Sequence, residues 1–192
     1  MTAKTFRALL LLSTGFALAP AFAAAQTCPS SIVAMPKSSS LYLYYPTTAD
    51  ATFPSYGGAP TSPLNPFNMA DLDSSIGTAA QMQQRVEQLT EAGYCEFDVD
   101  VRTRTTTPSP SEPRWQIVGI GTDATGTGLI GKAQAVDTND ADAQDYARFW
   151  VEELQGWAGA ELTGANSTLE RWSTALANLV VHESGHNYGG TH

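Results

Sequence analysis

Basic residues are scarce in this chain of 192 residues, which has 10 lysines and arginines against 19 aspartates and glutamates. The formal net charge is therefore -9, and an acidic surface repels the phosphate backbone of nucleic acids. Loss of residues 1–25 would remove two positive charges, Lys4 and Arg7, and no acid, so the charge would fall from -9 to -11. We therefore expect no nucleic-acid partner.

Hydrophobic runs are too short to span a membrane, because the longest apolar stretches lie near the N-terminus and fall short of the ~20 residues required. Residues 1–25 instead show the basic start, apolar centre and small residues of a secretory signal, with cleavage near Ala23 or Ala25. The alternative is a buried N-terminal helix. We expect a signal peptide over 1–25, a secreted or periplasmic mature chain, and no membrane contact after signal cleavage.

Cysteine is also rare, since only Cys28 and Cys95 occur. Both follow the expected signal, and export to an oxidising compartment favours a disulfide between them. Closing a loop of this length would stabilise the fold by roughly 4 kcal/mol in the chain-entropy model. The alternative is that Cys28 is a thiolate that blocks a metal site until activation.

Four segments have the alternation or the β-branched and aromatic residues of strands. They are residues 40–45, 96–102, 115–121 and 129–136. In the second segment we expect Phe97, Val99 and Val101 on the buried side. A further apolar run within 146–151 fits either a strand or part of a helix.

Two segments have helical spacing of apolar residues. The first spans 71–93, with Asp73 as the expected N-cap. The second follows Ser167 and Glu170, which fit an S-x-x-E capping box, and continues to the residue before Gly189. The order of strand, helix, several strands and a long helix predicts an α/β layered domain.

The three histidines of the chain all lie in its last 11 residues, H-E-S-G-H-N-Y-G-G-T-H. His182 and His186 are four residues apart on the expected helix, so their rings share one face and can reach one ion. Gly189 lets the backbone leave the helix sharply, so that His192 can return as a third ligand. Three protein nitrogens leave one zinc position for water, which is typical of a catalytic site.

Glu183 lies beside the expected metal without being needed as a ligand. A carboxylate at this place can deprotonate a zinc-bound water, which then attacks a carbonyl that the metal polarises. A competing interpretation is a histidine-rich helix end that favours the helix dipole. That interpretation explains neither Glu183 nor the Gly-x-x-His continuation.

The pattern His182-Glu183-x-x-His186-x-x-Gly189-x-x-His192 resembles the motif of the metzincin clan of zinc peptidases at every fixed position. The resemblance implies that the three histidines bind zinc and that Glu183 is the general base. It also implies an α/β fold like the upper subdomain of that clan. Such a fold has a mixed, mostly parallel twisted sheet with an antiparallel edge strand, one backing helix and a long active-site helix.

In that fold an antiparallel edge strand pairs with extended substrate. By order along the chain, the resemblance assigns this role to the segment that begins at Leu129. Its candidate residues for substrate contact are Leu129, Ile130, Gly131, Lys132 and Ala133. The alternative is an ordinary edge strand.

The chain departs from the clan after the third histidine, where metzincins continue to a methionine turn and a lower subdomain. All four methionines, Met1, Met35, Met69 and Met82, precede the motif. We therefore expect residues 26–192 to form the upper subdomain alone, with the lower subdomain absent, as a piece of a longer protein.

A cluster of aspartates precedes the ambiguous segment, at Asp137, Asp140, Asp142 and Asp145. Oxygen ligands at this density suit calcium, but the segment lacks the central glycine and the closing glutamate of an EF-hand loop. We favour a solvated acidic loop over a calcium site.

Together these features predict a secreted zinc endopeptidase that acts on a protein or peptide substrate. One alternative is a non-catalytic or weakly active zinc-containing peptide-binding module, because the sequence stops at the third ligand. Another is an exported zinc hydrolase that acts on a non-peptide amide.

Overall fold

The computed structural model describes residues 37–54, 63–122, 128–137 and 141–189. Its centre is a five-stranded sheet in the order β2-β1-β3-β5-β4. The strands are β1 (Ser39–Tyr44), β2 (Val99–Arg104), β3 (Trp115–Gly121), β4 (Gly131–Ala133) and β5 (Gln144–Trp150). All neighbours pair in parallel except β4, which lies antiparallel to β5 at one edge. The predicted α/β class with an antiparallel edge strand is confirmed.

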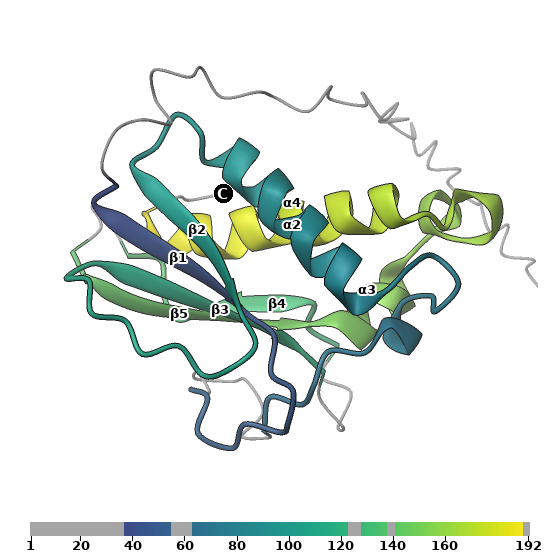
Figure 1. Cartoon of the computed structure of the whole chain (residues 1–192), viewed down its shortest axis with the longest axis horizontal. Helices are drawn as coiled ribbons and strands as arrows, with labels where there is room; N and C mark the ends of the chain where they lie inside the picture. The colour runs from purple at the N-terminus through teal and green to yellow at the C-terminus, as the bar shows by residue number, and fades with distance from the viewer. Residues whose placement is uncertain (1–36, 55–62, 123–127, 138–140, 190–192) are drawn as a thin grey trace, which may run out of the picture.

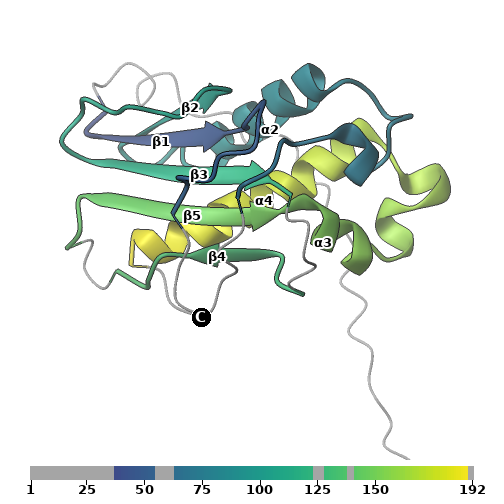
Figure 2. The ribbon, with the colours of Figure 1, turned by 90° about the horizontal axis from the view of Figure 1, so that it is seen from below.

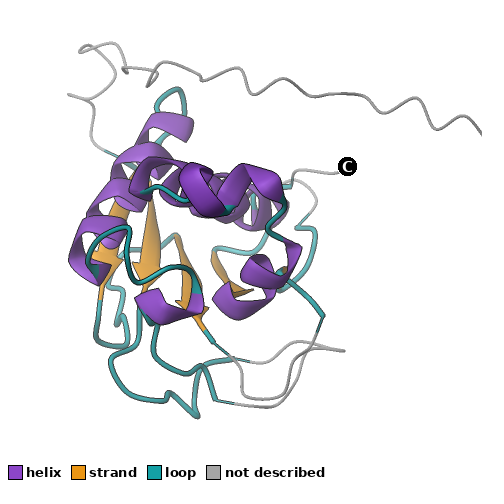
Figure 3. Ribbon diagram, turned by 90° about the vertical axis from the view of Figure 1, so that its right-hand side faces the viewer, coloured by secondary structure: helices purple, strands orange, loops and turns teal. Residues whose placement is uncertain are grey.

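Helices cover one face of this sheet. The α-helices of the described part are α2 (Ala79–Gly93), α3 (Val151–Trp157) and α4 (Leu169–Asn187). Short 3-10 helices occur at η1 (Met69–Asp71), η2 (Ala160–Leu162) and η3 (Gly164–Asn166). The two long helices, α2 and α4, run over the strands on the same side (Figures 1 and 3). None of the helices in the described ranges is long and apolar enough to cross a bilayer.

The main core lies between the sheet and these helices. On α4 the fully buried residues Trp172, Leu176 and Val180 pack in it, because they recur at helical spacing on one face. The strands contribute alternate residues such as Val118 and Ile120 of β3. Figure 2 shows α4 crossing behind β3 and β5 toward β4.

A smaller core lies on the opposite face of the sheet. Phe53 and Leu64 from the segment after β1 pack there with Tyr42, Trp115 and Ile117. A Cβ atom at Gly119 of β3 would lie only 2.6 Å from atoms of both Phe53 and Leu64. Absence of a side chain at this position therefore lets the segment lie directly on the strand.

The strand predictions differ from the structure mainly at their ends. The strand at 115–121 is confirmed, and β1 is shifted by one residue from 40–45. Strand β2 begins at Val99 rather than 96, so the expected burial of Phe97 is wrong, because this side chain precedes the strand and is 59% exposed. The run at 146–151, which fitted either a strand or a helix, contains both, because β5 ends at Trp150 and α3 begins at the next residue.

Helix α2 begins at Ala79, so the predicted start at 71 and the N-cap Asp73 are wrong. Thr78 is the N-cap and forms a capping box with Gln81, whose side chain accepts a hydrogen bond from the Thr78 N–H at 2.9 Å. Gly77 has a φ of 152°, which no helix residue adopts. The helical spacing of apolar residues continues through this glycine, and for that reason the pattern predicted a helix that starts too early.

Helix α4 is capped by Thr168, so the predicted capping box of Ser167 and Glu170 is wrong. The Ser167 hydroxyl instead donates to Asp73 at 2.5 Å, and Glu170 accepts two hydrogen bonds from Arg85 at 2.7 Å. Asp73 and Arg85 therefore hold the side chains of Ser167 and Glu170. The hydroxyl of Thr168 instead accepts the hydrogen bond from the free backbone N–H of Arg171 at the start of α4.

Candidate metal centre

The C-terminal half of α4 holds the motif at the surface. Its apolar face is buried in the main core. His182 is exposed and His186 is half-buried. A spacing of four residues places both rings on one side of the helix.

The two imidazoles lie close together, with their Nε2 atoms adjacent. Their Nε2 atoms are 3.3 Å apart, and their ring planes are inclined at 79° with centroids 4.7 Å apart. Two nitrogens that bind one zinc ion at ~2.05 Å in a tetrahedral arrangement are ~3.3 Å apart. The separation of the two Nε2 atoms is therefore compatible with a shared zinc ion.

Glu183 lies between these histidines and the edge strand β4. Its side chain is only 8% exposed, and burial raises the pKa of its carboxyl. The positive charge of His186 and a hydrogen bond from the backbone N–H of Ala133 act in the opposite direction, toward a lower pKa. The net effect is a raised pKa for a carboxyl beside the histidine pair, as a proton acceptor requires.

The inner side of the helix end is fixed by hydrogen bonds. The hydroxyls of Tyr94 and Ser184 are 2.6 Å apart, and the Asn187 amide donates to the Tyr146 carbonyl at 3.1 Å. Ser184 and Asn187 are fully buried. These bonds attach the end of α4 to α2 and to β5, so the motif is held by two layers of the fold.

The chain leaves α4 at Gly189, as predicted. Gly189 has a φ of 85°, and its N–H donates to the His186 carbonyl at 3.0 Å. This left-handed conformation favours glycine and turns the backbone away from the helix axis. His192 lies outside the described residues, so its role as third ligand stays a prediction.

No group of three or more histidines, cysteines or acidic residues that could hold a metal occurs within 37–54, 63–122, 128–137 and 141–189. The described part of the chain thus supplies the two adjacent Nε2 atoms of His182 and His186 and the carboxylate of Glu183. A catalytic zinc site needs a third protein ligand.

The predicted substrate strand is a sheet edge, but β4 is shorter than the segment 129–136. Leu129 and Ile130 precede it, and only Gly131, Lys132 and Ala133 form the strand. Glu183 lies against this strand, and no sequence pattern predicted that contact. A glycine inside a strand pattern often marks a close approach of another group, which was the available signal at Gly131.

The predicted disulfide partners are not both described. Cys95 is buried beside the end of α2, and Cys28 lies outside the described residues, as does the expected signal over 1–25. The pairing and the signal stay predictions.

The aspartate cluster is less exposed than a solvated loop. Asp137 and Asp145 are 8% and 2% exposed, so the expectation of solvation is wrong for these two. The Asp137 carboxylate accepts from the Asp142 N–H at 2.8 Å, and its own N–H donates to the His186 carbonyl at 3.0 Å. Asp140 lies outside the described residues. Asp137 therefore contacts both Asp142 and the end of α4.

A cavity of about 460 Å³ lies on the other side of the α4 end. Tyr94, Phe97, Val181 and Tyr188 line it, and none of His182, Glu183 and His186 does. This cavity is separate from the histidine pair. No family model, curated protein or solved structure matches the chain.

Proposed function

We propose that this chain belongs to a secreted zinc-dependent endopeptidase. The observation that carries the proposal is the 3.3 Å separation of the His182 and His186 Nε2 atoms, with the buried carboxyl of Glu183 beside them. A histidine pair alone would indicate metal binding without indicating a reaction. The added carboxyl with a raised pKa favours hydrolysis.

His182 and His186 would hold the ion, and His192 is the third ligand that the motif implies. When bound, zinc makes a water molecule acidic and polarises the carbonyl of the bond to be cleaved. Calcium is not part of the proposal, because the Asp137 carboxylate already accepts a hydrogen bond from the Asp142 N–H.

Glu183 accepts a proton from the attacking water and passes it to the departing amine. Because burial raises its pKa, the carboxylate takes up a proton more readily than an exposed glutamate would. The proton therefore moves from water to leaving group on one side chain, and no covalent bond to the protein is needed.

A peptide is the substrate class that best suits the surroundings. Strand β4 is a sheet edge beside Glu183, and an extended peptide can add to such an edge through main-chain hydrogen bonds. The residues at this edge are Gly131, Lys132 and Ala133. We include export in the proposal only because residues 1–25 have the features of a secretory signal.

The decisive variant is Glu183→Ala in the full chain. We expect its kcat for an unfolded protein substrate to fall by about 10²–10⁴, because general acid–base catalysis typically contributes that much. Zinc content measured by atomic absorption should stay near that of the unchanged protein. Glu96→Ala is the matched control, since Glu96 is an exposed glutamate outside the motif.

Other outcomes separate the alternatives. Normal turnover by Glu183→Ala would refute the assigned base. Zinc binding without cleavage of any unfolded protein would support a zinc-containing peptide-binding module. Cleavage restricted to non-peptide amides in a broad substrate panel would support an exported hydrolase of another class.

A further inference from the structure

The side chain of Glu183 occupies the place where residue 131 would otherwise have a side chain. An ideal Cβ atom on Gly131 would lie 2.6 Å from Oε1 of Glu183 and 2.9 Å from both Cδ and Cγ. The three nearest atoms thus all belong to one residue, and real Cβ contacts essentially never fall below 3.0 Å. Any other amino acid at 131 would displace this carboxyl.

Backbone conformation does not explain this glycine. Positive φ angles occur at Gly77, Gly128, Gly164 and Gly189, whereas Gly131 lies in a regular strand without one. An alanine could adopt the same backbone. The feature that distinguishes position 131 is therefore the space taken by Glu183.

The hydrogen bonds of β4 show which of its N–H groups face the open edge. Gln134 donates to the Tyr146 carbonyl at 2.9 Å, and Trp150 donates to the Ile130 carbonyl at 2.8 Å. Because bonded and outward-facing residues alternate along an antiparallel strand, the N–H groups of Gly131 and Ala133 point away from β5. The Ala133 N–H donates to the Glu183 carboxylate.

We propose that β4 positions the general base, with Gly131 as a positioning residue and the Ala133 N–H as the group that holds the carboxylate. The inference rests on the proposed function and adds to it. A glutamate has three rotatable side-chain bonds, and catalysis requires its carboxylate to be held within about 0.5 Å of its productive position. The gap over Gly131 and the bond from Ala133 restrict it to one place.

A consequence concerns the substrate. An extended peptide that adds to β4 would pair with the outward-facing groups of Gly131 and Ala133. One of these, the Ala133 N–H, is already used by Glu183. The base and the substrate strand therefore share one short edge, and the register of the substrate next to Glu183 is restricted.

The test measures hydrogen exchange of the Ala133 amide in the full chain, prepared free of metal. Glu183→Ala should speed this exchange by about tenfold or more, because a hydrogen bond to a charged acceptor is lost. Gly131→Ala should have the same effect by pushing the carboxylate away. Gly156→Ala, in α3 with nothing within 4 Å of its added Cβ, is the matched control and should leave the exchange unchanged.

A second readout concerns turnover with zinc bound. Gly131→Ala should lower kcat about a hundredfold, as misplacement of a catalytic group by about 1 Å does, with zinc content unchanged. Unchanged Ala133 exchange in Gly131→Ala would overturn the proposal. If that variant does not fold, unchanged exchange in Glu183→Ala overturns it instead.

The two proposals fail separately. If the Ala133 amide responds as expected but the chain neither binds zinc nor cleaves a peptide, the contact between β4 and Glu183 stands and the endopeptidase function falls. If the chain cleaves peptides and the amide does not respond, the positioning role falls alone.

Discussion

Two carboxyl groups show how their surroundings move a pKa in opposite directions. Burial against β4 raises the pKa of Glu183. At Glu112, hydrogen bonds from its own backbone N–H, from the Tyr42 hydroxyl and from Arg102 lower the pKa to about 2. Glu183 thus takes up a proton more readily than an exposed glutamate would, and Glu112 stays charged in the folded protein even in moderate acid.

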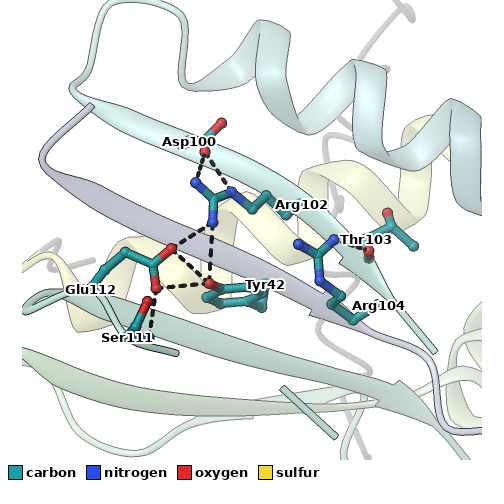
Figure 4. Close-up of polar contacts among 7 residues, drawn as sticks. All are labelled: Tyr42, Asp100, Arg102, Thr103, Arg104, Ser111 and Glu112. Carbon is teal, nitrogen blue, oxygen red and sulfur yellow. Dashed lines mark hydrogen bonds and ion pairs between the residues drawn. The ribbon is translucent and has the colours of Figure 1, made fainter. Parts of the chain in front are cut away.

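The Glu112 carboxylate belongs to a polar cluster that joins β1, β2 and the segment before β3 (Figure 4). Arg102 contacts Glu112 and Asp100 at 2.5 Å each, and the Tyr42 hydroxyl donates to Glu112 at 2.9 Å. The donors and acceptors in this cluster satisfy one another. We therefore interpret it as a structural brace for the strands.

This brace predicts a pH-dependent stability. The pKa of Glu112 is depressed by folding, so its contribution is present above the unfolded pKa of roughly 4.3 and is lost as pH falls through about 2. We expect Glu112→Gln to lower the free energy of unfolding by roughly 0.2–1 kcal/mol at pH 7, since the cluster is partly exposed. Urea denaturation of the variant and the unchanged protein at pH 7 and near pH 2 measures this difference in the free energy of unfolding.

The difference between the two proteins should shrink as the pH approaches 2. A difference that is the same at pH 7 and at pH 2 would contradict the role of the charged carboxylate. Ser111→Ala is a suitable control, because its backbone N–H still donates to Glu112.

At the scale of elements, the starts of both long helices depend on threonine. Thr78 and Thr168 are the N-caps of α2 and α4, and each hydroxyl accepts from the backbone N–H three residues on. Between them, Asp73 accepts from Ser167 and thereby links the turn before α2 to the turn before α4. This hydrogen bond joins the two segments that precede the helices.

The cap of α2 can be tested directly. Thr78→Ala removes the hydroxyl that accepts from the Gln81 N–H at 3.2 Å, and we expect a loss of about 1 kcal/mol in the free energy of unfolding. Thr78→Ser keeps the hydroxyl and should cost much less. Thermal or urea unfolding compares the two, and equal losses would show that the methyl group rather than the cap matters.

At the scale of the whole molecule, α4 connects the histidine pair to the core. Its buried face packs among the strands and α2, and its last turn is bonded to Tyr94 and Tyr146. A ligand that binds the exposed side of this helix end in the native state alone will stabilise the entire fold.

Zinc should therefore raise the unfolding temperature. At a free concentration of about 100 times the Kd, one site contributes about 2.7 kcal/mol to stability. We expect this gain in the full chain, its loss when a chelator is added, and no gain in His186→Ala. Calorimetry with and without zinc measures it, and an equal gain in the histidine variant would place the binding elsewhere.

Local patterns predicted much of this structure. The strand at 115–121 and the turn at Gly189 could be read from the chain, because alternation and glycine conformation are properties of neighbouring residues. The convergence of His182 and His186 is local as well, since four residues make about one helical turn. The sequence by itself thus determined the layered α/β class and the pair of nitrogens.

Contacts between distant segments decided the rest. Ser167 bonds to Asp73, so the cap of α4 lies one residue later than its pattern predicts. Likewise, the place of Glu183 depends on Gly131 and Ala133, which are about 50 residues away along the chain and touch it only because β4 lies at the sheet edge beneath α4. Tertiary structure alone decided the surroundings of this carboxyl, because burial and hydrogen bonding across elements arise only after the layers have packed.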